Sequence, residues 1–371
     1  LKPLFLERMQ RLLINKEDYE EYLEILKVVP VKSIRCNTLK ISPENLKRKL
    51  EEKGWKIKQP WKDYPEVMIV EGKIAENNFS DDKFIEEKNK LIDEFTINKV
   101  NIVKMTTAKN LAKSVLSNQS ASNSERDIID LEPGELGRSL EHLLGYYYVQ
   151  ELASMLPIIA LKPKQNELFL DLCASPGSKT TQTAAQMSNT GTIIANEISL
   201  GRIKILAANL ERCGVINTII TRKEGAALCK KFEQEKIMFD KILVDVPCSG
   251  EGTLRSSLKT YVMWNIKTIK YLPRIQKNLF KSALKILKVG GEIVYSTCTH
   301  APEENEAVID EILQEFNNIK IEEIKLPIKC RPGIEEWENK KYVKDVTKSC
   351  RIYPQDNNTE GFFIAKFRKV K

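Results

Sequence analysis

Short apolar runs alternate with helical segments along the chain from about residue 165 onward. The apolar runs occupy residues 168–172, 192–197, 218–220, 241–245 and 292–296. Repeated strand–helix units of this kind favour a parallel, doubly wound α/β sheet. Such a sheet binds its ligands beyond the carboxyl ends of its strands. Four of the runs end in, or lead into, a polar or reactive residue, so we expect a functional site there: Asp171, Glu197, Asp245 and Cys298.

The first part of the chain has a different pattern, which predicts a small α+β domain over residues 1–70. Residues 34–39 alternate like a half-buried strand. Ser42 followed by Pro43 is typical of a helix start, and Leu46 and Leu50 then share one helical face.

Residues 71–133 differ from both flanks because Asn, Lys, Asp, Glu and Ser dominate them. The run 117–124 has nothing to bury, which is typical of a linker. A helix is possible between residues 97 and 116. We therefore expect a partly disordered insertion here, followed by a second domain over residues 134–371.

Composition narrows the class of protein. The 59 Lys and Arg residues outnumber the 51 Asp and Glu residues, and the resulting net charge of +8 permits an acidic partner such as nucleic acid. No apolar run approaches the roughly 18 residues that cross a bilayer, so we expect no membrane association. The 8 cysteines among 371 residues are too sparse for a disulfide scaffold. We therefore expect reduced thiols and a cytoplasmic protein.

The loop after the first apolar run has features of a ligand-binding turn. A strand ends at Asp171, small residues follow, and Lys179 opens a helix. Backbone N–H groups in such a loop can approach a carboxylate or phosphate, although an ordinary strand–helix turn is the alternative. Glu197 ends the next run, 26 residues after Asp171. An acid at about this spacing accepts hydrogen bonds from ribose hydroxyls, which indicates a nucleoside cofactor.

Two cysteines follow neighbouring strands at the same expected edge. Cys248 lies in a loop with Pro, Ser and Gly directly after the strand that ends at Asp245, and Cys298 closes the last run. This placement suggests paired catalytic thiols, with a disulfide between them as the alternative. His142 and His300 do not have zinc-site spacing, so we expect no metal.

Two further segments allow two interpretations each. Nine basic residues and no acid lie between Gly252 and Glu292, and several share one helical face. This stretch is either a solvated amphipathic helix or a phosphate-facing surface. Residues 146–148 are three tyrosines, for which core packing is favoured over base stacking.

Together these motifs resemble the Nop/Sun (RsmB-like) family of RNA cytosine-5 methyltransferases, which use S-adenosylmethionine. The resemblance runs from about residue 136 to 369 and is weaker over residues 1–70. It implies a Rossmann-like methyltransferase domain with a small RNA-binding domain in front. Its most specific segments are 171–180, 245–253 and 295–299, with further matches at 302–309 and 351–367.

The resemblance also implies roles for individual residues. Cys298 would be the nucleophile, Cys248 the thiol that assists release, and Asp245 would lie between cofactor and base. Lys179 would belong to both the catalytic and the cofactor-binding residues. Glu197 would hold the ribose, and Glu224 would lie near the adenine. The expected cofactor-binding residues are Cys173, Ala174, Ser175, Pro176, Gly177, Ser178, Lys179, Glu197, Arg202, Glu224 and Asp245.

The chemistry of cytosine methylation agrees with such a set of residues. Carbon 5 of cytosine is a poor nucleophile, and addition of a thiolate at carbon 6 makes it electron-rich. An acid at ring nitrogen 3, for which Asp245 is the candidate, would stabilise the charge that addition creates. The target base must leave any stack to be reached from both sides.

The substrate class follows from the same resemblance. We expect a monomeric enzyme acting on tRNA, with ribosomal RNA as the alternative. A non-catalytic RNA-binding assembly factor is a third possibility, against which the presence of both cysteines argues. The chain departs from the family pattern in the 71–133 insertion, in Glu224 where Asp is commoner, and in Gln355 where many members have His.

Overall fold

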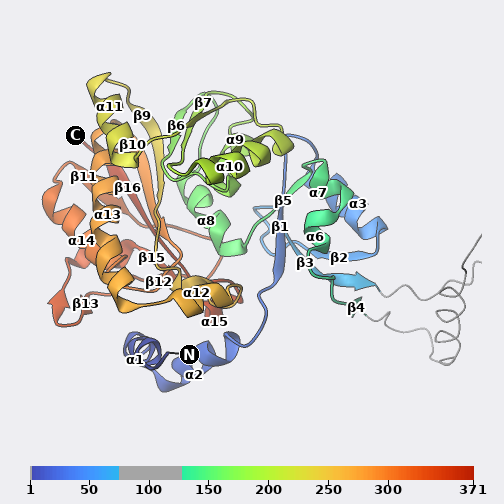
Figure 1. The fold of residues 1–371 in the computed structure, drawn as a ribbon, viewed down its shortest axis with the longest axis horizontal. Coiled ribbons are helices and arrows are strands. Elements are labelled where there is room, and N and C mark those ends of the chain that lie inside the picture. Colours follow the sequence, from blue (N-terminus) through green and yellow to red (C-terminus); the bar gives the residue numbers. More distant parts are fainter. Residues whose placement is uncertain (1, 75–127) are drawn as a thin grey trace, which may run out of the picture.

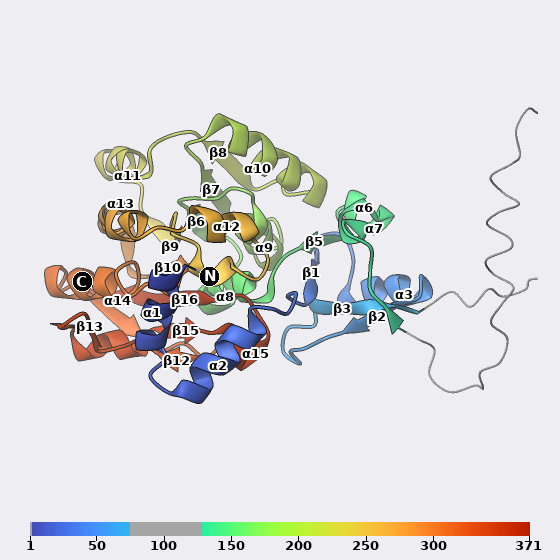
Figure 2. The same cartoon turned by 60° about the horizontal axis from the view of Figure 1, so that its bottom comes forward.

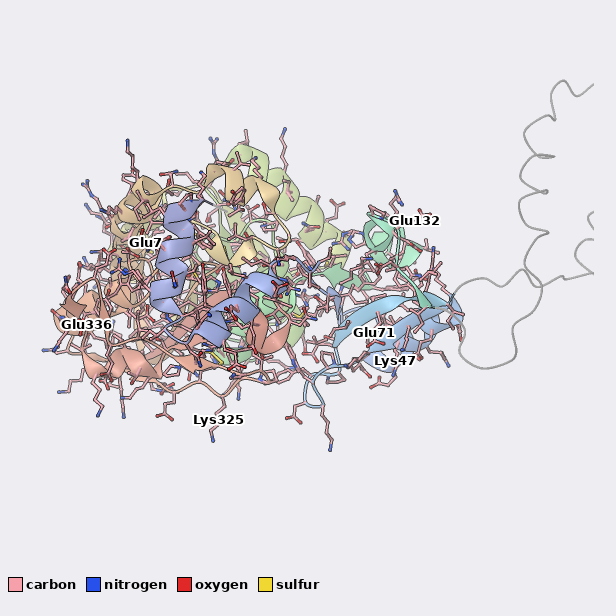
Figure 3. The ribbon with its side chains drawn as sticks, turned by 90° about the horizontal axis from the view of Figure 1, so that it is seen from below. Glu7, Lys47, Glu71, Glu132, Lys325 and Glu336 are labelled. Carbon is pink, nitrogen blue, oxygen red and sulfur yellow. A yellow bond between two sulfur atoms is a disulfide. The ribbon has the colours of Figure 1, made fainter. Side chains whose placement is uncertain are left out.

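The computed structural model describes residues 2–74 and 128–371, which form a small unit and a large unit side by side (Figure 1). The expected helix between residues 97 and 116 and the expected linker at 117–124 lie outside the described residues. Charged side chains cover the outside of both units, for example Glu71 on the small unit and Glu336 on the large unit (Figure 3).

The small unit is an antiparallel sheet with one long helix packed on it. The strand order is β2–β3–β1–β5, with β4 beside β3. The helix α3 begins after Ser42, whose side chain accepts a hydrogen bond from the backbone N–H of Asn45, and it buries Leu46 and Leu50, as the sequence predicted. The elements are β1 (Lys32–Cys36), α3 (Pro43–Glu52), β2 (Trp55–Lys58), β3 (Val67–Ile74), β4 (Ile128–Ile129), α6 (Glu135–Arg138), α7 (Leu140–Leu143) and β5 (Tyr147–Val149).

The predicted domain boundaries at residues 70 and 134 do not coincide with the ends of this sheet in the sequence. β3 extends into the expected insertion, β4 lies at its far end, and β5 lies beyond residue 134 although it pairs with β1. The sheet therefore takes strands from both sides of residues 75–127. Tyr147 is fully buried in β5, so the three tyrosines contribute to the core as favoured from the sequence.

The first two helices belong with the large unit rather than with the small sheet. Helices α1 (Pro3–Leu12) and α2 (Lys16–Ile25) lie beside α15 (Pro354–Asn357) (Figure 2). Phe5, Met9 and Tyr22 pack with Trp264 and Tyr353 of the large unit. Glu7, on the opposite face of α1, is exposed. Apolar side chains at helical spacing therefore fix these helices to a surface that lies far away in the sequence.

The large unit contains all five strands predicted from the apolar runs. Neighbouring pairs β10–β9, β9–β6, β6–β7 and β7–β8 are parallel. Chain order reverses between β6 and β9, because β7 and β8 lie on one side of β6 and β9 and β10 on the other. These strands are β6 (Leu168–Asp171), β7 (Thr192–Asn196), β8 (Thr218–Thr221), β9 (Phe239–Asp245) and β10 (Leu287–Thr297).

The expectation of a purely parallel sheet needs correction, because antiparallel strands extend it beyond β10. β16 pairs with β10 over six residue pairs. Away from β10, it also pairs with β11 and β15. The sheet is therefore mixed, with a parallel, doubly wound centre. The additional strands are β11 (Ile319–Glu322), β12 (Arg331–Pro332), β15 (Cys350–Ile352) and β16 (Phe362–Lys369), and a separate hairpin joins β13 (Glu336–Trp337) to β14 (Lys340–Lys341).

Helices cover both faces of this sheet, as a doubly wound fold requires. On one face Leu279 and Val308 of α13 and α14 pack with Ile242 and Tyr295 of the sheet. On the other face Leu156 of α8 packs with neighbouring strands. The helical elements of this unit are α8 (Leu152–Leu161), α9 (Ser178–Gln186), α10 (Leu200–Cys213), α11 (Gly225–Gln234), η1 (Glu251–Thr253), α12 (Leu258–Met263), α13 (Ile266–Lys285), α14 (Glu306–Glu315) and η2 (Lys344–Lys348).

The expectation that all cysteines are reduced thiols is wrong for two of them. Cys330 and Cys350 form a disulfide that links the segment before β12 to β15. Six cysteines are free in the described parts of the chain. Among the helices described there, none has both the length and the apolar composition needed to cross a bilayer.

A buried ion pair connects the antiparallel extension to α14. Nε and Nη2 of Arg351 each donate a hydrogen bond to the carboxylate of Glu306. The side chains of Arg351 and Glu306 are almost inaccessible to solvent. Removing one partner would leave the other charge buried without compensation, which costs about 3–5 kcal/mol.

Glu306→Gln should therefore lower the free energy of unfolding by about this amount, measured by chemical denaturation followed by circular dichroism. The control is Lys16→Ala, which removes an exposed pair with Glu20 within α2 and should have little effect because water screens such pairs. An equally small effect of Glu306→Gln would contradict the role assigned to this pair.

Candidate active site

A cavity of about 1020 Å³ lies at the carboxyl ends of β6, β7 and β9, next to the point where the chain order reverses. Doubly wound sheets bind ligands at this position. Six residues predicted to bind the cofactor line the cavity: Cys173, Ser175, Glu197, Arg202, Glu224 and Asp245.

The other residues of the predicted loop do not line this cavity but shape the turn beside it. Ala174 is buried, and its N–H donates to the carbonyl of Asn196 on the next strand. Pro176 is exposed. Gly177 caps α9 with a φ of 103°, a left-handed conformation that favours glycine. Ser178 begins α9.

Glu197 is the most buried carboxylate at the cavity. Its side chain is 3% exposed, and it accepts the N–H of Ser199 at 2.9 Å. Arg202 lies 3.1 Å from the second carboxylate oxygen and also donates to the carbonyl of Ser175 at 2.6 Å. Arg202 therefore ties the loop after β6 to the acid after β7.

Glu224 lines the cavity, but its carboxylate is hydrogen-bonded to the protein backbone. Both oxygens accept backbone N–H groups at the start of α11, from Ala226 at 3.1 Å and from Ala227 at 2.7 Å. Glu224 is therefore the N-cap of α11. Its carboxylate is therefore engaged with the backbone of its own helix.

A second cavity of about 620 Å³ lies between the two units. From one side it is lined by Lys32 and Ser33 of the small unit and by the segment before them. Its lining also includes Lys179, Asp245 and Cys298 of the large unit. The predicted nucleophile therefore faces a space that both units enclose.

Asp245 lines both cavities and is fixed by two contacts. Ser296 Oγ donates to one carboxylate oxygen at 2.7 Å, and Lys179 Nζ lies 2.9 Å from the other. Burial by itself would lower the pKa of Lys179, but the adjacent Asp245 outweighs it and raises that pKa. Lys179 is thus a buried ammonium directed at the second cavity, whereas it does not line the cofactor-sized one.

The two predicted thiols are in direct contact. Cys248 Sγ lies 2.9 Å from Cys298 Sγ and accepts the N–H of Cys298 at 3.3 Å. Both are free cysteines, so the alternative of a disulfide between them is not what the structure contains. The hydrogen bond with Cys298, together with burial, raises the pKa of Cys248 well above that of an ordinary thiol. Cys298, not Cys248, lines the second cavity.

Three members of the basic stretch between Gly252 and Glu292 have structural partners. Lys277 and Lys281 of α13 both contact Glu311 of α14, and Lys281 also contacts Glu315. Arg255, before α12, donates to the carbonyl of Thr359 and to the side chain of Asn358. These contacts support the structural interpretation for these three residues, whereas Arg274, also on α13, is exposed and lines the first cavity.

The sequence reasoning missed a buried network that joins the units beside Lys179. Arg35 of β1 is 2% exposed, and it donates to the carbonyl of Ser178, to Thr181 Oγ1 at 2.8 Å, and to the side chain of Gln150. Burial lowers the pKa of Arg35 to about 10. The sequence holds little signal for this role, because β1 reads Lys-Ser-Ile-Arg-Cys and Arg35 is not its only polar residue.

Fold and site together define the class. A doubly wound sheet has a nucleotide-sized cavity at its reversal point, and an aspartate paired with a lysine lines both this cavity and a second one that is also lined by a free cysteine. This arrangement is that of a Rossmann-like methyltransferase. The family model described as "16S rRNA methyltransferase RsmB/F" matches residues 158–368. The chain belongs to this RsmB/F (Nop/Sun) family, which confirms the resemblance found in the sequence.

Relatives and solved structures agree with this assignment. A tRNA (cytosine(49)-C(5))-methyltransferase of Pyrococcus abyssi is 47% identical over 235 residues, which cover 63% of this chain and 74% of that protein. Ribosomal RNA small subunit methyltransferase F of Aliivibrio salmonicida is 33% identical over 100% of this chain, which spans 64% of the length of that relative. NSun6 from Pyrococcus horikoshii, solved with SFG, has a TM-score of 0.72 and 27% identity, covering 100% of this chain and 98% of that one.

The contrast between the two thiols predicts selective alkylation. Iodoacetamide at about pH 8, near the pKa of an ordinary thiol, should label Cys298 before Cys248, because Cys298 lines the cavity and Cys248 is held protonated behind it. Peptide mapping by mass spectrometry measures the order, with Cys298→Ala as the control. Earlier labelling of Cys248 would contradict this geometry.

Proposed function

We propose that the protein methylates carbon 5 of cytosine in RNA with S-adenosylmethionine as methyl donor. The observation that carries the proposal is the position of Cys298. It lies on the cavity between the units, in contact with a second thiol, and Asp245 joins that cavity to the one at the strand ends. A base in one cavity and a methyl donor in the other would meet at Asp245.

The first cavity fits S-adenosylmethionine by its size and its donor set. The buried carboxylate of Glu197 can accept hydrogen bonds from two ribose hydroxyls. The loop with Cys173 and Ser175 lies near the carboxyl end of β6, where the methionine part would bind. The similarity to an NSun6 structure that contains SFG, an analogue of S-adenosylmethionine, supports this choice of cofactor. The cofactor, when bound, supplies the methyl group and no metal is required.

The residues of the second cavity can carry out the remaining steps. The thiolate of Cys298 adds to carbon 6 of cytosine, and the ring's electrons move toward nitrogen 3. The Lys179 ammonium, held 2.9 Å from the Asp245 carboxylate, can donate a proton or a hydrogen bond to this side of the ring. After methyl transfer, Cys248 releases its own proton to solvent and then takes the proton from carbon 5. The electrons of that bond form the double bond between carbons 5 and 6, the bond between carbon 6 and Cys298 breaks with its electrons on sulfur, and 5-methylcytosine leaves.

The proposed substrate is tRNA, with ribosomal RNA as the second candidate. Over the 235 residues that it matches, the Pyrococcus abyssi tRNA methyltransferase is the more similar relative, at 47% identity. The ribosomal RNA enzyme is 33% identical, but the match covers the whole chain. The presence of both thiols and of the Lys179–Asp245 pair argues against a non-catalytic assembly factor.

We further propose that the small unit binds RNA, because Lys32 and Ser33 of this unit line the cavity that would receive the base. A base turned out of its stack would contact both units at once. Since one chain supplies the residues that line both cavities, we propose that a monomer is active. We place it in the cytoplasm, where tRNA and ribosomes are found.

Replacing each thiol separately tests the proposed reaction. Cys298→Ala should form neither product nor covalent adduct, because no bond to carbon 6 can form. Cys248→Ala should permit attack and methylation but stall release, leaving protein and RNA joined through Cys298. The assay is a denaturing gel with unmodified tRNA transcripts and labelled S-adenosylmethionine. Full activity of both single variants would refute the covalent mechanism.

Glu197 provides a test of the cofactor site alone. Losing hydrogen bonds to a charged group costs about 1.5–3 kcal/mol, so Glu197→Ala should weaken S-adenosylmethionine binding by about tenfold or more. Calorimetry measures this affinity, and Glu211→Ala, at an exposed position on α10, is the matched control. Unchanged affinity in a folded Glu197→Ala protein would exclude Glu197 as a ligand of the ribose.

A further inference from the structure

The loop that carries Cys248 is held from behind by a buried glutamate that the sequence analysis did not single out. Glu304 is inaccessible to solvent, and its Oε2 atom accepts the N–H of Ser249 at 3.0 Å. Ser249 directly follows Cys248 in the chain. The carboxylate of Glu304 therefore binds the residue that is next to Cys248 in the chain.

Gln276 of α13 completes this clamp. Its side-chain amide donates to the carbonyl of Pro247 at 3.0 Å and to Glu304 Oε2 at 2.8 Å. The residues on both sides of Cys248, Pro247 and Ser249, are thus fixed to the same buried pair. The side chain of Gln276 is itself fully buried.

The same glutamate also contacts the strand that carries Cys298. The hydroxyl of Tyr295, three residues before Cys298 on β10, donates to the backbone carbonyl of Glu304. Cys298 has further anchors of its own, because its carbonyl accepts the N–H of Gly252 at 2.9 Å and β10 pairs with both β9 and β16. Cys248, in a loop, depends more strongly on the clamp than Cys298 does.

We propose that Glu304 is a positioning residue that holds Cys248 against Cys298 and is required chiefly for release of the methylated base. This inference rests on the proposed function, in which Cys298 attacks and Cys248 completes the reaction. Without Glu304 the loop would lose its acceptor at Ser249, so that Cys248 would no longer stay within reach of carbon 5. The attack by Cys298 would continue, and adduct would accumulate.

The burial of Glu304 is consistent with a specific local role. Burial raises its pKa to about 7, against the opposing effect of its hydrogen bonds with Ser249 and Gln276. Its second oxygen, Oε1, has no hydrogen-bond partner. A buried carboxyl with an unused oxygen is costly for stability alone, which favours a function for it beside the thiol.

The experiment measures the ratio of trapped adduct to released product for Glu304→Ala, with unmodified tRNA transcripts and labelled S-adenosylmethionine. This ratio does not depend on the fraction of protein that is folded, so a merely structural role would not change it. Loss of one hydrogen bond to a buried loop should raise the ratio by about tenfold. Glu304→Gln keeps an oxygen acceptor for Ser249 and should restore a ratio close to that of the wild type.

Two further variants make the test specific. Glu303→Gln changes the neighbouring glutamate, which contacts Arg8 and Trp337 instead, and should leave the ratio unchanged. Gln276→Ala removes the other half of the clamp and should raise the ratio in the same direction, which keeps the test available if Glu304→Ala does not fold.

The outcomes separate this inference from the function on which it rests. If Cys248→Ala traps adduct but neither Glu304→Ala nor Gln276→Ala does, the positioning role of Glu304 is overturned and the proposed function stands. If Cys248→Ala itself traps no adduct, the proposed function fails and this inference fails with it.

Discussion

The adjacency of β6, β9 and β10 in one parallel layer is the constraint on which the site depends. Parallel neighbours end at the same edge of a sheet, so Asp171, Asp245 and Cys298 come together although they are far apart in sequence. The reversal of chain order between β6 and β9 separates the two following loops and leaves a cavity between them. Antiparallel β16 then pairs with the far side of β10 and fixes the position of the strand that leads into Cys298.

The buried charge of Lys179 at this edge links the small unit to the candidate site. Lys179 can remain charged in a buried position only because Asp245 lies beside it. Lys179 stands in the first turn of α9, and Arg35 of the small unit binds the carbonyl of Ser178 and the side chain of Thr181 in that turn. The orientation of α9, and with it the Lys179–Asp245 pair, therefore depends on contacts from β1. A change in how the units pack would therefore shift the Lys179–Asp245 pair.

The central strands and the thiols could be predicted from the sequence because each leaves a local signal. Buried parallel strands are short apolar runs, and the reactive residues follow them directly. The antiparallel additions left weaker signals, since β12 and β15 span two and three residues. The docking of α1 and α2 on the large unit, and the pairing of Lys277 and Lys281 with Glu311, depend on surfaces that meet only in the folded chain. The disulfide between Cys330 and Cys350 was missed for the same reason.

The unequal environments of the two thiols give the proposed reaction its direction. A thiolate attacks, so the nucleophile must face the base, and Cys298 is the thiol that lines the second cavity. Cys248 lies behind it, and the contact with Cys298 together with burial favours its protonated form. Once Cys298 has bonded to the base it is no longer a thiol, so its hydrogen bond no longer raises the pKa of Cys248, whereas burial still does. In the proposed reaction Cys248 therefore has to release its proton before it can take the one on carbon 5, which places its step after the attack by Cys298.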